Sequence, residues 1–269
     1  MKTMTKSVSP VRAEPTLLVK LKDGVATLTL NRPKQYNAIS TEMLAEFSAA
    51  LRKIAADRKV RVVVIAANGP AFSGGHDLRE MMANRNEKFI GELFDNCSNV
   101  MLQIKELPQP VIARVQGIAT AAGCQLVAAC DMAVASTEAR FATSGINLGL
   151  FCATPGVPVS RNIPRKRAFE MLFTGEFIDA ETALAWGLIN RVARPERLDA
   201  EIASLVQLIK EKPPAVCAEG KHLFYDQIES TLANAYKIAS KAITLNMLGE
   251  DAGEGVGAFI EKRRPNWRK

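Results

Sequence analysis

The stretch VRVVVIAANGPAFSGGHDL, residues 60–78, decides the architecture of this chain. Its first part, Val60–Ala67, is a nearly continuous run of β-branched and small apolar residues, which is typical of a strand buried on both faces. Asn68, Gly69 and Pro70 then break the strand. The glycines at positions 74 and 75 allow a tight turn and a close approach of the main chain to a ligand. The stretch therefore predicts a buried strand that turns sharply into a helix.

Strand and helix signals alternate on both sides of this stretch. Val25–Leu30 alternates apolar and polar residues, which predicts a strand, and Ser40 can cap a helix whose apolar residues recur at helical spacing up to Ile54. Further along, the patterns predict a helix at Phe89–Lys105, a strand at Val111–Val115, a helix at Ala121–Cys130 and a strand at Met132–Ala135. This alternation indicates an α/β fold with largely parallel strand pairing.

The last third of the chain has a different pattern. Asp179 can cap a helix that runs through Trp186, with Gly187 ending it. Residues 198–246 are then mostly helical, with an interruption at Pro213 and Pro214. We therefore divide the chain into a flexible tail at 1–15, a core at 16–196 and a helical region at 197–269.

The composition is that of an ordinary globular protein. Of 269 residues, 48% are hydrophobic and 23% are charged, which excludes disordered, collagen-like and fibrous chains. The formal net charge is +7, but residues 261–269 carry +4 and residues 1–15 carry +2, so the body carries about +1. A nucleic-acid-binding domain carries its basic stripe within the fold. We therefore expect solvated tails and no nucleic-acid partner.

The cysteine and histidine content argues against metal and disulfide sites. The five cysteines are an odd number without CxxC spacing, and there are only two histidines, so we expect neither a metal nor a disulfide framework. No apolar run reaches 18 residues, so we expect no membrane span. The N-terminus lacks the apolar stretch of a secretory signal. We expect a cytoplasmic protein, or one of the mitochondrial matrix in a eukaryote.

Two segments are suited to binding through the backbone. Residues 71–78, AFSGGHDL, place two glycines after the buried strand, with Asp77 expected in the first turn of the next helix. Residues 117–124, GIATAAGC, place small residues where a helix begins, and the free N–H groups of such an end favour negative charge. An ordinary turn and close packing are the structural alternatives. The second segment lacks the Lys and Ser/Thr of a P-loop and is no GxGxxG fingerprint.

Together these two segments could form an oxyanion hole. Two backbone N–H groups aimed at one point stabilise the negative charge that develops on a carbonyl oxygen, and each is worth about 3 kcal/mol. A thioester enolate is an anion that such a hole would suit.

Five strings of residues, in this order along the chain, resemble the signatures of one family. They are NRPKQYNAIS (31–40), AFSGGHDLREM (71–81), VQGIATAAGCQLVAACDMAVAS (115–136), TGEFIDAETALAWGLINRV (174–192) and AFIEKRRPNW (258–267). The chain resembles the enoyl-CoA hydratase/isomerase (crotonase) superfamily from about Leu17 to Trp267. The resemblance implies a spiral of ββα units with a helical C-terminal part that builds homotrimers, commonly paired into hexamers. It also implies an acyl-CoA substrate, fatty acyl-CoA metabolism and no permanently bound cofactor, coenzyme A being part of the substrate.

The resemblance also implies a set of site residues. The two oxyanion donors correspond to the backbone N–H groups of His76 and Ala122. Residues expected along coenzyme A are Asn37, Ala38, Gly74, His76, Asp77 and Leu78. Phe259 and Lys262 correspond to positions near the nucleotide end, in some members from a neighbouring subunit.

The chain departs from the family at both catalytic acids. Hydration needs two glutamates, and their positions here hold Gln125 and Gly145. A carboxamide has no useful proton affinity near neutral pH, Gly145 offers only space, and residues 146–156 contain no acid. Because general acid–base catalysis contributes about 10²- to 10⁴-fold per group, we expect weak or absent hydratase activity. The alternatives are chemistry that needs only enolate stabilisation, such as decarboxylation or isomerisation, and a non-catalytic acyl-CoA-binding regulator.

Five further side chains near these segments have a functional or a structural interpretation. Cys152 is a nucleophile or, more simply, a packed thiol. The His76 side chain takes part in catalysis or faces coenzyme A or solvent. Asp131, at a strand start, is expected to form structural hydrogen bonds. Arg79 and Glu80 are expected on a solvated helix face.

Overall fold

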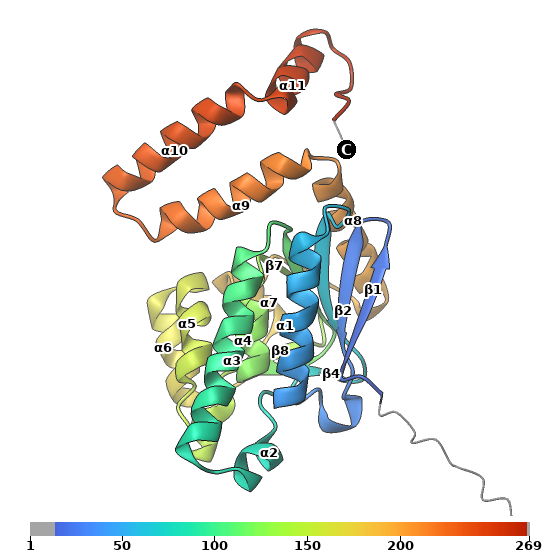
Figure 1. The fold of residues 1–269 in the computed structure, drawn as a ribbon. Coiled ribbons are helices and arrows are strands. Elements are labelled where there is room, and N and C mark those ends of the chain that lie inside the picture. The colour runs from blue at the N-terminus through green and yellow to red at the C-terminus, as the bar shows by residue number, and fades with distance from the viewer. Residues whose placement is uncertain (1–13, 268–269) are drawn as a thin grey trace, which may run out of the picture.

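The computed structural model describes residues 14–267 and arranges them as an α/β body from which C-terminal helices extend (Figure 1). One sheet has the strand order β1-β2-β3-β5-β7-β10, and a second has the order β4-β6-β8-β9. The strands are β1 Leu17–Lys22, β2 Val25–Leu30, β3 Val62–Ala67, β4 Ala71–Ser73, β5 Val111–Val115, β6 Ile118–Thr120, β7 Met132–Ser136, β8 Arg140–Ala142, β9 Ile178–Asp179 and β10 Arg191–Ala193. The helices are α1 Thr41–Ala56, α2 Leu78–Ala83, α3 Glu87–Glu106, α4 Ala122–Ala129, α5 Ala153–Asn162, α6 Arg165–Thr174, α7 Ala180–Trp186, α8 Leu198–Lys210, α9 Pro214–Ile228, α10 Leu232–Met247 and α11 Glu250–Ile260.

Strand β3 is the buried strand that the sequence predicts. All its residues are buried, and it pairs in parallel with β2 and β5. Alternate side chains of a strand face opposite sides of the sheet. Val63 and Ile65 pack into the main core, to which α1 and α3 contribute, whereas Val62 and Val64 pack against α8. Burial on both faces explains the continuous apolar run.

Several predicted elements are confirmed with their boundaries. The strands at Val25–Leu30 and Val111–Val115 match β2 and β5. The Ser40 hydroxyl accepts a hydrogen bond from the Met43 N–H at 3.2 Å, and α1 begins directly after it. Asp179 caps α7 through the Thr182 N–H, and Gly187 ends that helix with φ of +87°. These elements follow local rules, which is why the sequence suffices for them.

The largely parallel strand pairing is as predicted, and β1 with β2 and β8 with β9 pair antiparallel. The helical stretch at 198–246 comprises α8, α9 and α10, and α11 lies within the helical region expected at 197–269, although its bounds were not predicted. Helices α5 and α6 were also not predicted. Of the tail expected at 1–15, residues 1–13 lie outside the described part of the chain.

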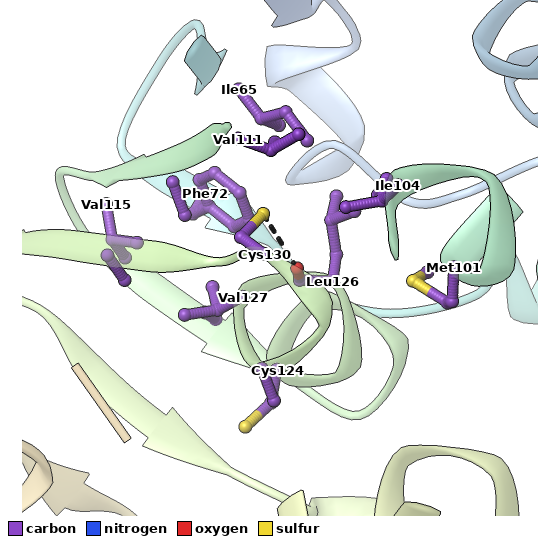
Figure 2. Packing of buried hydrophobic residues seen from close by; sticks show 14 of the residues in the cluster. Ile65, Phe72, Met101, Ile104, Val111, Val115, Cys124, Leu126, Val127 and Cys130 are labelled. Atoms are coloured by element: carbon purple, nitrogen blue, oxygen red, sulfur yellow. Dashed lines mark hydrogen bonds between the residues drawn. The ribbon is translucent and has the colours of Figure 1, made fainter. Parts of the chain in front are cut away.

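Helix α4 lies inside the main core. Figure 2 shows Leu126 and Val127 on this helix with Phe72 near them, and the Cys130 thiol donates to the Leu126 carbonyl oxygen at 3.2 Å. The Cys124 side chain lies on the opposite side of α4 from Cys130 (Figure 2). The start of this helix is therefore fixed by packing along its length.

Helices α9 and α10 form an antiparallel pair that projects from the body (Figure 1). Lys221 holds α9 to the body, because its ammonium group donates to the Ile104 and Gln109 carbonyl oxygens at 2.8 and 3.0 Å and pairs with Asp131 at 2.8 Å. Asp131 also accepts from the Tyr225 hydroxyl at 2.7 Å, so it has the structural role expected from the sequence. Among residues 14–267, no helix is both long and apolar enough to cross a membrane.

Candidate functional site

The two backbone segments singled out in the sequence touch each other. Gly75 has φ of +96°, a conformation that side-chain-bearing residues rarely adopt. A Cβ atom at Gly75 would lie 2.9 Å from the Ala121 Cβ and 3.5 Å from the Ala122 nitrogen. The main chain just before His76 therefore packs directly against the start of α4, with no room for a side chain between them.

The start of α4 has an unusual backbone. Ala121 has φ of +49° and ψ of −119°, which is a strained conformation for a residue other than glycine. Its N–H donates to the Ala142 carbonyl oxygen at 3.1 Å, and its own carbonyl oxygen accepts from Gln125 at 3.0 Å. Ala122 is the first helical residue, so its N–H has no partner within the helix. At Gly123 a Cβ atom would overlap the Ser73 carbonyl oxygen, so α4 can come this close only with glycine there.

The loop with His76 is held by a short parallel bridge to Ile39. The Ile39 N–H donates to the Gly75 carbonyl oxygen at 2.8 Å, and the Asp77 N–H donates to the Ile39 carbonyl oxygen at 3.1 Å. In this pattern the groups of residues 75 and 77 face Ile39, so the N–H of His76 points away from it. The bridge thus leaves the His76 N–H free of strand pairing.

Asn37 and Ala38, expected along coenzyme A, brace this loop. The Asn37 side chain is fully buried. Its Nδ2 donates to the Asn68 and Ala71 carbonyl oxygens, both at 2.8 Å, and its Oδ1 accepts from the Arg32 N–H. The Ala38 carbonyl oxygen accepts from the Arg32 guanidinium at 2.6 Å. The Asn37 side chain therefore shapes the loop and has no donor left for a ligand.

The sequence suggested that Asp77 lies in the first turn of α2. In the structure it lies one position earlier, as the N-cap of this helix. One carboxylate oxygen accepts from the Arg79 and Glu80 N–H groups, and the other pairs with Arg32 at 2.8 Å. Burial raises the pKa of Asp77, but the Arg32 guanidinium and the helix N–H groups outweigh it, and the pKa is lowered overall. Leu78 begins α2 half exposed, and Gly74 is exposed with its N–H donating to Tyr36.

The His76 imidazole lies against α3. Its ring meets the Phe94 ring edge-on, at a centroid distance of 5.2 Å and an angle of 90°. Both ring nitrogens are buried, and neither has a hydrogen-bond partner among residues 14–267. Burial lowers the pKa of His76 below 6.5 against the opposing effects of the Ile39 backbone and the Glu80 carboxylate. The imidazole is therefore neutral at physiological pH.

Gln125 lies under the same face of α3. The Cys97 thiol is 4.0 Å from the Gln125 Oε1, and burial raises the pKa of Cys97 to about 12. Residues three apart on a helix share a face, so Phe94 and Cys97 together cover the His76 imidazole and the Gln125 carboxamide. Phe94 and Cys97 were not identified from the sequence, because the only available signal was their helical spacing.

The expectation that Gly145 offers open space is wrong. A Cβ atom at Gly145 would lie 2.6 Å from the Leu150 carbonyl oxygen and 2.8 Å from the Cys152 Sγ. The loop after β8 folds back and fills this space. Burial raises the pKa of Cys152, with the Gly145 backbone opposing. A protonated thiol is a poor nucleophile, so the geometry favours the packed thiol over the reactive one.

The carboxylates nearest the two segments are already engaged. Glu80 is not on a solvated face as expected, because its carboxylate accepts from the Thr41 N–H at the start of α1, at 3.0 Å. Arg79 is exposed as predicted. Within residues 14–267, no group of three or more histidine, cysteine and acidic residues could hold a metal ion.

Phe259 and Lys262 do not meet the rest of the expected coenzyme A site in one chain. Phe259 lies on α11 and is 84% exposed, and Lys262 follows that helix. Helices α11 and α2 lie at opposite ends of the molecule (Figure 1). A second subunit would be needed to bring these two residues to a site beside α2.

Comparison with known proteins assigns the fold and the family. A family model described as enoyl-CoA hydratase/isomerase matches residues 20–269. This chain belongs to the enoyl-CoA hydratase/isomerase family. Its mixed α/β fold, with two sheets and C-terminal helices, is the crotonase fold.

Individual relatives support the assignment. The chain is 44% identical over 256 residues to enoyl-CoA hydratase domain-containing protein 3, mitochondrial, of Rattus norvegicus. The aligned region covers 95% of this chain and 85% of the rat protein. The crystal structure of the human protein of that name has a TM-score of 0.91 at 43% identity and covers 94% of this chain and 100% of the other. The crystal structure of an enoyl-CoA hydratase from Mycobacterium smegmatis has a TM-score of 0.93 at 56% identity, covering 95% and 100%. The crotonase resemblance seen in the sequence is thereby confirmed.

Proposed function

We propose that this protein binds an acyl-CoA thioester and holds its carbonyl oxygen between the backbone N–H groups of His76 and Ala122. The close packing of Gly75 on the start of α4 carries the proposal, because a Cβ atom added at Gly75 would lie 3.5 Å from the Ala122 nitrogen, which leaves no room for a side chain between the two donor segments. The bridge to Ile39 supports it, since that pairing leaves the His76 N–H pointing away from the strand. Coenzyme A would follow Ala38, Gly74, Asp77 and Leu78, while the fully buried Asn37 holds this loop in shape without touching the ligand.

We infer that hydration of a 2-enoyl-CoA is slow in this protein. Gln125 provides a carboxamide where the family has one glutamate, and the space around Gly145 is taken by Leu150 and Cys152. What remains is a site that can polarise a thioester and stabilise an enolate. Turnover of an enoyl or malonyl thioester would indicate chemistry that needs only this stabilisation, whereas tight binding without turnover would indicate a regulator.

We also propose that the chain assembles as a homotrimer or as a pair of trimers. Side chains that are more than half exposed lie on α9, α10 and α11 and in the link between the last two, namely Phe224, Leu232, Tyr236, Leu248 and Phe259. Phe224, Leu232 and Tyr236 line one groove between α9 and α10, and exposed apolar surface of this kind marks an interaction site. Assembly would also allow Phe259 and Lys262 of one subunit to reach coenzyme A on another. Light scattering should give three or six times the 29.2 kDa chain mass, and a monomer would contradict the proposal.

Cytoplasmic location, or the mitochondrial matrix in a eukaryotic cell, is part of the same proposal. The rat relative is named as mitochondrial. Fractionation of the source cells with an antibody to the chain would test it.

The test of the proposed hole is Ala122→Pro. Proline is tolerated at the first position of a helix, and here it removes the N–H and places its Cδ atom where that N–H points. Butyryl-CoA should therefore bind at least about 10-fold more weakly, since one hydrogen bond is lost and the hole is narrowed, whereas free coenzyme A should bind unchanged. Glu87→Pro, at the first position of α3, is the matched control and should leave both affinities intact. Equal loss for coenzyme A and butyryl-CoA would contradict the hole.

A further inference from the structure

Helix α6 and the loop before α5 carry an aromatic patch, which consists of Phe151, Phe169 and Phe173. The rings of Phe169 and Phe173 stack at a centroid distance of 4.0 Å, and the Phe151 ring lies 5.2 Å from that of Phe173. All three side chains are more than half exposed. Because contiguous exposed apolar surface on a soluble protein marks an interaction site, the aromatic patch indicates that another molecule packs on it.

The groove between α9 and α10, called the arm groove below, has the complementary shape. It encloses about 460 Å³ and is lined mainly by apolar side chains, among them Leu223, Phe224, Leu232 and Tyr236. Aromatic rings gain contact energy when they pack against other rings and apolar side chains. A pair of rings that projects from a surface, as in the aromatic patch, can fill a hollow of this kind.

The two surfaces also have complementary charges. Arg165 lies one helical turn before Phe169 on the same face of α6 and is exposed. On α9, Glu219 and Asp226 lie four residues before and three residues after Leu223, so both flank the arm groove, and both are exposed. Opposite charges at the rims of two apolar surfaces attract and orient them.

Within one chain the aromatic patch and the arm groove are neighbours, and both remain exposed. Arg161 at the end of α5 pairs with Glu229 at the end of α9 at 3.3 Å, which joins the two surfaces into one continuous region. A ring of identical subunits forms when one surface of each chain contacts a different surface of the next chain. A patch and a groove side by side provide such a pair of surfaces.

We propose that the aromatic patch of one subunit docks in the arm groove of a second copy of this chain. This inference rests on the proposed assembly, to which it assigns two different contact surfaces. Exposed rings with a cation beside them would also suit an anionic lipid surface. The arm groove favours the second copy, because it offers both a matching hollow and an acidic rim.

This docking connects assembly to the candidate site. Phe151 directly precedes Cys152, whose Sγ would lie 2.8 Å from a Cβ atom at Gly145. The Leu150 N–H closes the same loop by donating to the Gly145 carbonyl oxygen at 3.0 Å. A neighbour seated on Phe151 therefore holds in place the loop that fills the space beside Gly145. The candidate site of one subunit is in this way completed by a second subunit.

Light scattering of two variants and of their mixture tests the docking. The patch variant, Phe169→Asp with Phe173→Asp, keeps the arm groove, and the groove variant, Leu232→Asp with Tyr236→Asp, keeps the aromatic patch. Each variant alone lacks one of the two surfaces, so we expect about one third of the wild-type mass. An equimolar mixture retains one intact pair of surfaces, so we expect about two thirds. Leu208→Asp, at an exposed position of α8, is the control and should keep the wild-type mass.

Hydrogen exchange of residues 146–152 tests the effect on the site. The groove variant keeps every residue of the patch and of this loop, so a change in the loop reports the missing neighbour. The Gly149 and Leu150 amides are hydrogen-bonded within the loop. We expect them to exchange at least about 10-fold faster in the groove variant than in the wild-type assembly. The gain of mass on mixing shows independently that both variants are folded.

The outcomes separate this inference from the proposed assembly. A patch variant with the wild-type mass, a mixture that stays at one third of that mass, or unchanged exchange in the groove variant would overturn the inference alone. Binding of the wild-type protein to vesicles of phosphatidylcholine and phosphatidylserine, lost in the patch variant, would assign the patch to a lipid surface and also overturn it. A monomeric wild-type protein would overturn the proposed assembly and this inference together.

Discussion

The two sides of the candidate site are built in different ways. The amide side, formed by residues 73–77 and 120–123, consists of main chain packed on main chain, with glycines wherever a side chain would collide. The acid side, formed by positions 125 and 145 with Cys152, consists of side chains and a loop that has closed over one position. The amide side tolerates no change of shape, whereas the acid side could exchange its side chains without a change of the fold.

This difference indicates which part of the site depends on the fold itself. Moving α4 away from Ser73 would break the packing of the second sheet. A change in the shape of the amide side would therefore destabilise the whole fold. An exchange of glutamine and glutamate at position 125 would alter no packing of that kind. The proton-transfer groups at this position can therefore change while the geometry of the amide side persists.

The strongest way to break the amide side is Gly123→Val. Its Cβ atom would overlap the Ser73 carbonyl oxygen, and neither main-chain segment can move without breaking its own pairing. We expect a loss of about 4 kcal/mol in the free energy of unfolding, measured by urea denaturation, together with loss of acyl-CoA binding.

Gly91→Ala is the matched control for that substitution. Gly91 lies within α3, and a Cβ atom there meets nothing within 4 Å. We expect the free energy of unfolding to increase by about 0.5–1 kcal/mol, because alanine is a better helix former than glycine. Equal stability of Gly123→Val and wild type would show that the main chain at the start of α4 is free to move.

Gly145→Glu tests whether the acid side can be restored where the loop has closed. The new Cβ atom would lie 2.6 Å from the Leu150 carbonyl oxygen. The loop must therefore move before the glutamate side chain can be accommodated. We expect a loss of about 3 kcal/mol in stability from overpacking and charge burial, with no gain in crotonyl-CoA hydration. A stable variant with increased hydration would show that the loop opens readily.

Gln125→Glu tests the other position, where a side chain of the same size as glutamate is already accommodated. The substitution preserves shape, and burial raises the pKa of a carboxyl group, which suits it to accept a proton. We expect hydration of crotonyl-CoA to rise about 100-fold, the lower end of one general acid–base group, since the second acid is still missing. The loss of thioester absorbance measures it.

Gln207→Glu, on the exposed face of α8, is its control and should leave the rate unchanged. A rate for Gln125→Glu equal to wild type would mean that the carboxamide lies outside the reach of the substrate.

The sequence was sufficient where local rules or a buried strand determine the structure. Strands β2 and β5, the Ser40 cap and the end of α7 at Gly187 all follow from residues within a few positions of one another. The second sheet was not predicted, because its strands have only two to three residues each. Helices α5 and α6 were not predicted either, and α5 contains Pro158, which argues against a helix in the sequence. Short elements of this kind are stabilised by distant contacts that periodicity does not reveal.

The candidate site was predictable in its backbone and less so in its side chains. The glycine spacing pointed to both segments, and these do touch. The bracing by Asn37, the contact of Glu80 with Thr41 and the closed space at Gly145 depend on residues about 5 to 39 positions apart. Such contacts cannot be inferred from one sequence without coordinates.

The smallest effect we predict concerns the side chain that joins both sides of the site. The pKa of His76 is lowered in the folded protein, so between its folded value and the ordinary 6.5 the unfolded chain binds more protons than the folded one. Stability should therefore be fully present above pH 6.5 and should fall as the pH drops through this window, by at most about 1.4 kcal/mol per pH unit. Urea denaturation at pH 5.5 and 7.5 should show a smaller decrease for His76→Phe than for wild type. An equal decrease in both proteins would mean that the imidazole takes up its proton in place, which would require an open path from solvent to a ring that is buried here.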